Sequence, residues 1–590
     1  MKKFFGRMFA SFFGMVLFAL VSIFVFIAVI AGSMASSEKV EKVKDGSVLE
    51  IKLSQPIVDN SNEDIMAGFN SALMGNATEK SISLKNVLDA ICKAKNDDKI
   101  KGIVIDAGIG ASQGTATMQE VRDALKCFKD SSGKFIYAYG EVYSQTGYYL
   151  ASVADKIYIQ NEGAVELKGI WLQLQFFKKL MDKVGVEMQI IRHGKFKSAV
   201  EPFINEKMSD ENREQYTLLA NSMWHEIVLG IAEGRNLSPE RVNEIADSLL
   251  SFNKKTLVCN NIVDQFMERD YFNDTVLKDM HLVSIAKYNS AVKEEKKEKT
   301  KDRIAVIYAQ GEVGMGKGSV GEIGTENISN AIKKAANNKN VKAIVLRVNS
   351  PGGSVLTSDI IYRAVLEAKA KKPVVASYGT YAASGGYYIS CAANKIYSDP
   401  TTLTGSIGVF GMIPNAQKLL TDKVGLTFDE VKTNENSGMG NITRQLTDYE
   451  RGTYQQSIED VYFGFISKVA EGRGKTVEYI DSIGQGRVWT GVDALRIGLV
   501  DELGGLNAAI KGAAELAEIT EYRISEYPEK KDPMTQFMEL LGQSSDARLQ
   551  KELARTLGLE GAAMYKALQQ VQETDEMQVY ARMPFGIVVE

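Results

Sequence analysis

Residues 341–354 read VKAIVLRVNSPGGS, a β-branched apolar run that ends in a turn with paired glycines. The apolar core of this run, 343–348, predicts a buried strand, and residues 358–370 have the spacing of an amphipathic helix. Outward from it, 304–309 and 373–377 are further strand-like runs with helical patterns between them. Strands that alternate with helices predict a parallel sheet covered on both faces, so the sequence is that of an α/β protein.

The same pattern occurs twice along the chain. Segments of the first half recur in order in the second half at a nearly constant offset of about 240 residues. Ordered matches of this kind predict a duplicated domain, and hence two tandem domains of one fold. The matched pairs are IKGIVI at 100–105 with VKAIVL at 341–346, GYY at 147–149 and 386–388, DKVG at 182–185 and 422–425, and AEGR at 232–235 and 470–473.

Composition limits the classes of function. The 590 residues carry a formal net charge of -4, and so small a charge argues against a nucleic-acid binder. Any histidine base would have to be His193, His225 or His281. The cysteines have no CxxC spacing, so we interpret them as small buried residues rather than metal ligands or a disulfide framework. They are Cys92, Cys127, Cys259 and Cys391.

The N-terminus carries a membrane signal. An almost unbroken apolar run at 8–30 follows Lys2, Lys3 and Arg7, and about 20 apolar residues span a bilayer. The positive flank should remain in the cytoplasm, which places the rest of the chain on the periplasmic side of a bacterial inner membrane. The alternative is a cleaved signal peptide, because SMA at 33–35 resembles a cleavage site, but the apolar cores of signal peptides are typically shorter.

Ser384 is the candidate nucleophile. In YAASGGYY at 381–388 it lies between a strand and an apolar helical pattern that extends to about residue 393, which predicts a position at a helix N-terminus. There the helix dipole and the free amides favour an incipient alkoxide, and Gly385 leaves its own N–H accessible. The alternative is that Ser384 is only an N-cap.

Gly352 and Gly353 follow a strand at its carboxyl end, where open α/β sheets place their sites. Paired glycines let backbone amides approach a ligand closely, and such amides can stabilise an oxyanion. The alternative is a glycine turn that merely starts the next helix.

Lys197 is the candidate general base. On the repeat, Ser384 aligns with Gln145 and Lys197 aligns with Ser437, so only the first half has the lysine and only the second has the serine. This pattern predicts a site divided between the halves. Burial lowers the pKa of a lysine from about 10.4, and a neutral amine could accept the serine proton. Lys195 is the competing candidate, and the other alternative is a solvated surface charge. The apolar neighbours of Lys197 are Phe196, Ala199, Val200 and Phe203.

At these residues the chain resembles the signal peptide peptidase A family, also called protease IV, in its long duplicated form. The matching segments are the N-terminal anchor, NSPGGS at 349–354, ASGGY at 383–387, TLTGSIG at 402–408 and KSAVEPF at 197–203. The resemblance implies a crotonase-like fold, related to the proteolytic subunit of the Clp protease, in both halves. It also implies a Ser/Lys dyad for peptide hydrolysis, with Ser384 as nucleophile and Lys197 as general base. In the same way it implies that Ser406 orients the lysine amine and that Gly353 and Gly385 supply oxyanion amides.

The resemblance further implies a biological role. We expect a serine endopeptidase that degrades cleaved signal peptides, contacts inner-membrane lipid, forms a bowl-shaped homotetramer and needs no metal or organic cofactor. The alternatives are an acyl-CoA enzyme of the crotonase type and a non-catalytic membrane scaffold. A histidine triad built on His193 is a further alternative.

Repeat, anchor and motifs together predict five segments. We expect a cytoplasmic stub and transmembrane anchor at 1–35 and a crotonase-like domain with the general-base lysine at 45–290. A charged linker at 291–303 should lead to a second crotonase-like domain, with the nucleophilic serine, at 304–525. A helical tail should follow at 526–590.

Overall fold

The computed structural model describes residues 42–60, 81–108, 114–292, 300–318, 321–528 and 580–582, together with residues 13, 14 and 17. Most of the expected membrane anchor, the charged run at 293–299 and most of the expected tail lie outside these residues. Among the residues that are described, no helix is both long enough and apolar enough to cross a bilayer.

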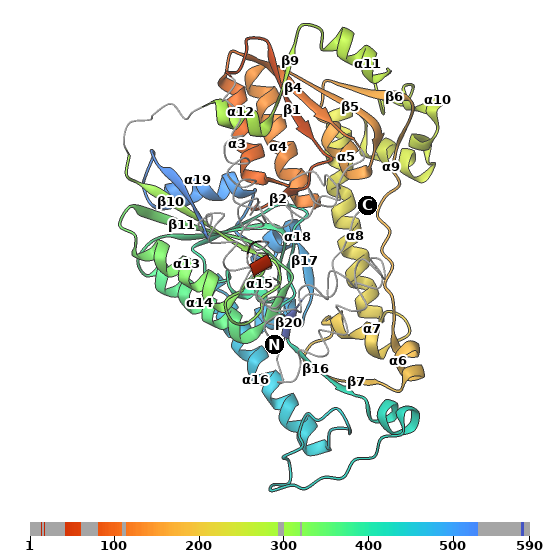
Figure 1. The fold of residues 1–590 in the computed structure, drawn as a ribbon, viewed down its shortest axis with the longest axis vertical. Helices are drawn as coiled ribbons and strands as arrows, with labels where there is room; N and C mark the ends of the chain where they lie inside the picture. Colours follow the sequence, from red (N-terminus) through yellow and green to blue (C-terminus); the bar gives the residue numbers. More distant parts are fainter. Residues whose placement is uncertain are drawn as a thin grey trace, which may run out of the picture.

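A six-stranded sheet forms the centre of the first half in the described residues (Figure 1). Its strands follow the order β8-β6-β5-β4-β1-β9, and all neighbouring strands are parallel. The strands are β1 (Ser47–Lys52), β4 (Ile100–Asp106), β5 (Phe135–Tyr143), β6 (Lys156–Val165), β8 (Gln265–Phe266) and β9 (His281–Ser284), and β2 (Ile57–Val58) and β3 (Ile82–Ser83) form a separate pair. The helices are α3 (Leu84–Asn96), α4 (Thr115–Ser132), α5 (Gln145–Ala151), α6 (Lys178–Val184), α7 (Glu201–Ile204), α8 (Asp210–Arg235), α9 (Pro239–Asp247), α10 (Lys254–Leu257), α11 (Arg269–Tyr271) and α12 (Ile285–Ala291).

Among the described residues, the second half contains an eight-stranded sheet. Its main path is β17-β15-β13-β11-β10-β19, β14 pairs with β13 and β18, and only the β15–β17 pair is antiparallel. The strands are β10 (Arg303–Gln310), β11 (Val341–Ser350), β13 (Val374–Ala383), β14 (Lys395–Ser398), β15 (Leu403–Gly405), β17 (Val488–Thr490), β18 (Glu502–Leu503) and β19 (Arg523–Tyr527). The helices are α13 (Thr325–Asn337), α14 (Val355–Lys369), α15 (Gly385–Tyr388), α16 (Asp448–Arg473), α17 (Val477–Ile483), α18 (Gly491–Arg496) and α19 (Leu506–Leu516).

These elements confirm the α/β fold class. The strands predicted at 304–309, 343–348 and 373–377 lie within β10, β11 and β13, and the helix predicted at 358–370 is α14. Each observed strand is longer than predicted, because residues beyond the apolar runs also pair with neighbouring strands.

The helix expected from Ser384 to about residue 393 is shorter than predicted. α15 ends at Tyr388. Beyond it, the Ser390 hydroxyl donates to the carbonyls of Gly386 and Tyr387, and the Ser390 amide also donates to the carbonyl of Tyr387. Serine side chains compete with helical backbone bonding in this way, so the chain tightens into turns although its residues remain apolar.

The cysteine prediction is wrong at three positions. Cys92, Cys127 and Cys259 are exposed, and only Cys391 is buried. Cys92 and Cys127 lie at exposed positions of α3 and α4, so their place on a helix outweighs the preference of the thiol for the interior.

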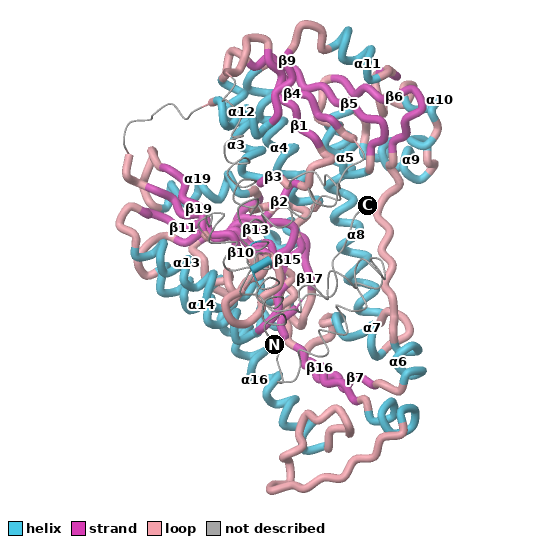
Figure 2. Tube along the Cα trace, viewed as in Figure 1, coloured by secondary structure: helices cyan, strands magenta, loops and turns pink. Residues whose placement is uncertain are grey.

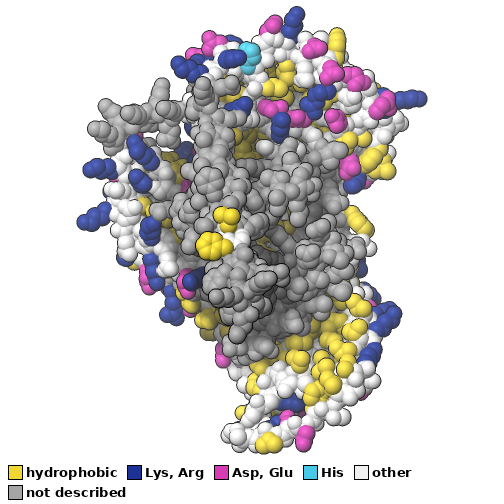
Figure 3. All heavy atoms as spheres, in the orientation of Figure 1, with side chains coloured by type: hydrophobic (Ala, Val, Ile, Leu, Met, Phe, Trp, Pro, Cys, Tyr) yellow, Lys and Arg dark blue, Asp and Glu magenta, His cyan; other side chains and the backbone are white. Residues whose placement is uncertain are grey.

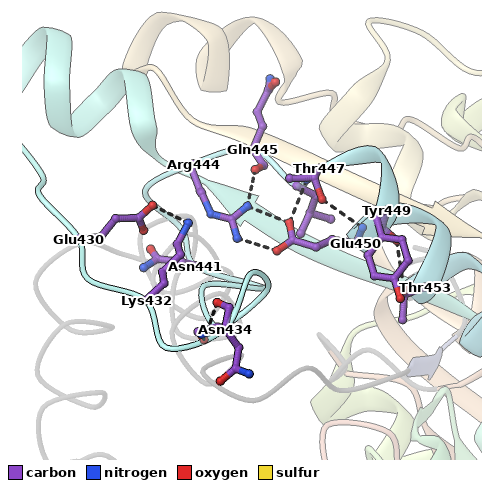
Figure 4. Close-up of polar contacts among 12 residues, drawn as sticks. Glu430, Lys432, Asn434, Asn441, Arg444, Gln445, Thr447, Tyr449, Glu450 and Thr453 are labelled. Carbon is purple, nitrogen blue, oxygen red and sulfur yellow. Dashed lines mark hydrogen bonds and ion pairs between the residues drawn. The ribbon is translucent and has the colours of Figure 1, made fainter.

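The long helix α16 begins at a capping box (Figure 4). The Thr447 hydroxyl accepts from the amide of Glu450, and the Glu450 carboxylate accepts from the amide of Thr447. Arg444 binds the same carboxylate with two N–H groups at 2.8 and 2.6 Å and is the largest cause that lowers the pKa of Glu450 to about 2. These bonds satisfy amides that have no partner in the first turn of a helix.

A third sheet joins the halves in the order β12-β20-β16-β7. β7 (Glu187–Arg192) belongs to the first half, and β16 (Phe410–Asn415) belongs to the second; they pair antiparallel over six residues and lie side by side in Figure 2. β12 (Gly352–Ser354) and β20 (Tyr580–Arg582) complete the sheet. Through β7, a segment of the first half is held against the second half.

A buried ion network also fastens the two halves together. Arg347 of β11 is fully buried; its Nε lies 2.7 Å from Asp59 Oδ1, and its Nη2 binds Glu120 of α4. Asp59 also accepts from the Asn349 side chain, two residues further along β11. The carboxylates come from the first half and the guanidinium from the second, so each half neutralises charge buried by the other.

We predict that Arg347→Met lowers the free energy of unfolding by about 3–5 kcal/mol, because it leaves two buried carboxylates without their cation. The control is Arg363→Met, which removes an exposed pair with Asp359 and should cost less than about 1 kcal/mol. Urea denaturation of both variants measures the difference, and equal losses would contradict the role of Arg347.

Candidate active site

The loop that carries Lys197 comes from the first half and is laid on the second. Beyond β7, the amide of His193 donates to the carbonyl of Val409 at 3.2 Å, and the amide of Phe196 donates to the carbonyl of Gln485 at 3.0 Å. These main-chain bonds fix the loop on both sides of the bend that leads to Lys197.

Gly486 lets this loop approach closely. Its φ is +85°, and a Cβ at this position would lie 2.6 Å from both the amide nitrogen and the Cβ of Lys197. A side chain would therefore push the lysine backbone away, so the glycine is required by the contact as well as by its backbone conformation.

Ser384 sits at a strained turn between β13 and α15. Its φ of 56° and ψ of -115° are unusual for a residue with a side chain. Its amide donates to the carbonyl of Gly405 at 2.8 Å, which holds the turn against the end of β15. Ser384 occupies the N-cap position, but its hydroxyl makes no capping bond. The hydroxyl is directed at the loop from the first half.

Lys197 Nζ lies 2.8 Å from Ser384 Oγ. It also lies 3.1 Å from Ser406 Oγ and 3.2 Å from the Ser406 carbonyl oxygen. All three residues are fully buried, and the three oxygen atoms that contact Nζ are neutral. Burial alone lowers the pKa of Lys197 well below its usual 10.5, which favours the uncharged amine.

The structure thus brings three of the residues singled out in the sequence, Ser384, Lys197 and Ser406, into contact within one chain. Lys195 is exposed, and His225 and His281 are exposed as well. His193 stacks on Tyr462 with ring centroids 4.0 Å apart, away from the hydroxyl that Lys197 contacts. The geometry favours Lys197 over these competing candidates.

The glycine loop packs directly against the serine turn. β12 contacts α15, and a Cβ on Gly386 would lie 2.8 Å from the carbonyl oxygen of Ser350. Gly353 has a φ of +151°, and a Cβ there would lie 2.1 Å from the carbonyl oxygen of Val313. Gly385 is the first residue of α15. The oxyanion role of the Gly353 and Gly385 amides stays a prediction.

Gln145 fills the corresponding position in the first half. Its side-chain oxygen accepts from the amides of Lys168 and Gly169 at 3.1 and 3.0 Å, and its amide group donates to the Gly169 carbonyl at 3.2 Å. In the first half, the Gln145 side chain is bonded to the neighbouring backbone. In the second half, the Ser384 hydroxyl at the corresponding position contacts Lys197 instead.

Two supporting residues were missed in the sequence. Arg192 donates to the carbonyl of Lys197 at 3.2 Å, and Glu201 is fully buried and accepts from Ser209 and Asn212. The sequence does hold a signal for Glu201, because it is an acidic residue inside the apolar KSAVEPF segment and a buried carboxylate needs hydrogen-bond partners.

Comparison with known proteins agrees with this geometry. The family model described as "Peptidase family S49" matches residues 129–305 and 367–520, and the model described as "Clp protease" matches residues 295–402. "Protease 4" of Salmonella typhi is 35% identical over 88% of this chain and 86% of its own length. "Protease 4" of Haemophilus influenzae is 33% identical over 83% of this chain and 82% of its own length. "Serine protease SPPA, chloroplastic" of Arabidopsis thaliana is 31% identical over 81% of this chain and 70% of its own length.

The α/β fold, the Clp-protease-like region and these relatives together identify the chain as a serine-type endopeptidase. Within that class, the chain belongs to peptidase family S49, the family of protease IV and signal peptide peptidase A. The acyl-CoA enzyme and the non-catalytic scaffold are therefore not favoured.

The buried lysine leads to a prediction about stability and pH. Between the lowered pKa of Lys197 and 10.5, the unfolded chain binds a proton at this residue and the folded chain does not. The free energy of unfolding should therefore rise with pH in this window, by about 1.4 kcal/mol per pH unit from this group. We predict that Lys197→Met is more stable than the natural protein near neutral pH and that its advantage shrinks toward pH 10.5.

Urea denaturation at about pH 8 and about pH 9.5 measures this difference. Lys195→Met is the matched control, because Lys195 is exposed and should leave the pH dependence unchanged. A stability difference between Lys197→Met and the natural protein that does not vary with pH would show that Lys197 is charged in the folded state.

Proposed function

We propose that the protein is a membrane-anchored Ser/Lys endopeptidase that degrades remnant signal peptides after their release from secreted proteins. Ser384 is the nucleophile and Lys197 the general base. The observation that carries the proposal is the 2.8 Å contact between Lys197 Nζ and Ser384 Oγ in a pocket where burial keeps the amine neutral. Two relatives named "Protease 4" and one named "Serine protease SPPA, chloroplastic" support peptide hydrolysis by a serine nucleophile.

The proposed reaction has two stages. The neutral Lys197 amine has one lone pair and two N–H groups; the N–H groups donate to Ser406, and the lone pair takes the Ser384 proton. The Ser384 oxygen then attacks the peptide carbonyl carbon, and the Lys197 ammonium protonates the leaving amine. Water repeats the sequence on the acyl-enzyme, which releases the second product and restores the hydroxyl.

Backbone amides would stabilise the tetrahedral intermediate. Gly385 follows the nucleophile at a helix start, and Gly353 lies in the strand packed against that helix. Amides that converge beside the serine place positive dipoles where negative charge develops on the carbonyl oxygen.

The architecture we propose is a duplicated crotonase-like domain behind an N-terminal anchor. The strand order β6-β5-β4-β1 in the first half corresponds to β15-β13-β11-β10 in the second, which supports duplication at 45–290 and 304–525. The apolar run at 8–30 supports a single-pass anchor with the catalytic body in the periplasm.

We also propose a homotetramer in contact with inner-membrane lipid. Exposed apolar side chains gather on α6 and on the adjoining segment at 424–431, and Figure 3 shows hydrophobic atoms on this end of the molecule. Leu419 donates its amide to Gly185, so the two apolar segments are joined. A surface of this kind is typical of an interaction site. Its members are Leu180, Val184, Val424, Leu426, Phe428 and Val431.

We predict that Ser384→Ala and Lys197→Met each lower kcat/KM for a fluorogenic leucine-rich peptide by at least about 10³-fold, because each removes a group that reacts in both stages. His193→Ala should keep activity within about tenfold, since His193 does not contact the serine. Circular dichroism confirms that the variants are folded. An active, folded Ser384→Ala protein would reject the proposed nucleophile.

Removing residues 2–31 should move the protein from the membrane fraction to the soluble fraction of a bacterial lysate, because the apolar run is then lost. Immunoblotting after ultracentrifugation measures the distribution, with Lys195→Met as a control that keeps the run. A shortened chain that remains fully in the membrane fraction would show that another part of the protein holds it there.

A further inference from the structure

The loop that leads to Ser406 begins at a buried carboxyl group, that of Asp399. Asp399 directly follows β14 and is only 1% exposed. Further along the loop, Thr401 donates its amide and its hydroxyl to the Gln119 side-chain oxygen at 3.4 and 3.1 Å. Gln119 belongs to α4, so this loop of the second half lies on a helix of the first half. The loop then enters β15 and reaches Ser406, which contacts the Lys197 amine.

The Asp399 side chain meets the carboxylate of Glu120, which also belongs to α4. The two side chains are in hydrogen-bond contact. Glu120 accepts from the Arg347 guanidinium and from the Leu506 amide, so it is the acceptor in this cluster. Among the described residues, no N–H or O–H group donates to either carboxyl oxygen of Asp399. Two ionised carboxylates repel each other at contact distance, whereas a proton on one of them forms a hydrogen bond to the other.

The charges around Asp399 also oppose its ionisation. The Arg347 guanidinium already faces two buried carboxylates, so an ionised Asp399 would add a further negative charge without a cation. Burial, followed by the charge of Glu120, raises the pKa of Asp399 well above its usual 3.8, and the charge of Arg347 acts in the opposite direction. The titratable groups of this cluster in the described part of the chain are Glu120 and Asp123 of α4, Tyr149 of α5, Arg347 of β11, and Asp59.

We propose that Asp399 is a carboxylic acid in the folded protein and that its proton, donated to Glu120, fastens the loop before Ser406 to the first half. An unfolded aspartate is ionised at neutral pH, so the proton is taken up when the two halves come together. Asp399 is then a positioning residue, because it acts on the dyad only through the loop. Alkaline pH removes the proton and puts two negative charges in contact where the halves meet. This proton site does not depend on the function proposed above.

Infrared spectroscopy of the full chain, in a detergent without carbonyl groups, tests the proposal directly. A protonated carboxyl group has a C=O stretch that a carboxylate lacks. The spectrum of the natural protein minus that of Asp399→Asn should show this band at about pH 8, where ordinary aspartates are ionised. A difference spectrum without the band would mean that Asp399 is ionised, and would overturn the proposal.

Asp123→Asn is the matched control for the spectrum. Desolvation is the largest cause that raises the pKa of Asp123 to about 6, so this neighbour is ionised at about pH 8 and its difference spectrum should lack the band. Labelling the aspartate carboxyl carbons of the natural protein with the heavy carbon isotope needs no variant. The band should shift on labelling, and a band that stays in place would overturn the proposal even if Asp399→Asn does not fold.

The pH dependence of stability gives a second readout. Above the usual pKa of 3.8, the unfolded chain has released the proton that the folded chain holds at Asp399. The natural protein should therefore lose stability relative to Asp399→Asn as the pH rises, until the raised pKa is passed. Urea denaturation should show the ratio of the two unfolding equilibrium constants, natural over variant, rising at least about tenfold between about pH 6 and about pH 8. A smaller rise would overturn the proposal.

Discussion

The rest of the structure depends on keeping the Lys197 amine uncharged against Ser384. A lysine gives up its proton only where water and carboxylates are absent, and its pocket supplies neutral oxygens from Ser384 and Ser406 alone. Such a pocket costs stability, because the unfolded chain would keep the charge. The loop is therefore held by main-chain bonds at His193 and Phe196, just before the lysine, and by Gly486, which lets it approach closely.

The same constraint explains why the two halves are fastened so strongly. The base is on one half and the nucleophile on the other, so any sliding between them would open the pocket and let water charge the amine. The Arg347 network resists sliding because Asp59 and Glu120 would be left in the interior without their cation. Asp59 also holds Asn349, whose side-chain oxygen accepts from the amide of Tyr381 on the strand that leads to Ser384. The ion network is thus linked to the strand before Ser384 through the side chains of Asp59 and Asn349.

Much of this could be predicted from the sequence, and the exceptions have physical reasons. Apolar runs in the sequence predicted β10, β11 and β13. The serine occurs only in the second repeat and the lysine only in the first, and this difference indicated Ser384 and Lys197. The early end of α15 was missed because the Ser390 hydroxyl, and not hydrophobicity, decides it. Arg347 stands in an apolar run, and its two partners are 288 and 227 residues away, so only the fold brings them together. β20 has three residues, too few for a periodicity to be recognised.

The sheet that joins the halves also connects the glycine loop with the base. Phe410 of β16 pairs with Tyr580 on one side and with Arg192 on the other. Arg192 is the last residue of β7, and its guanidinium donates to the carbonyl of Lys197. The sheet therefore runs from β12, which carries the glycine loop, to β7, the edge strand that leads to the lysine loop. The glycine loop beside Ser384 and the loop of Lys197 are then held by one hydrogen-bonded sheet, which accounts for a lysine delivered to the serine by a strand from the opposite half.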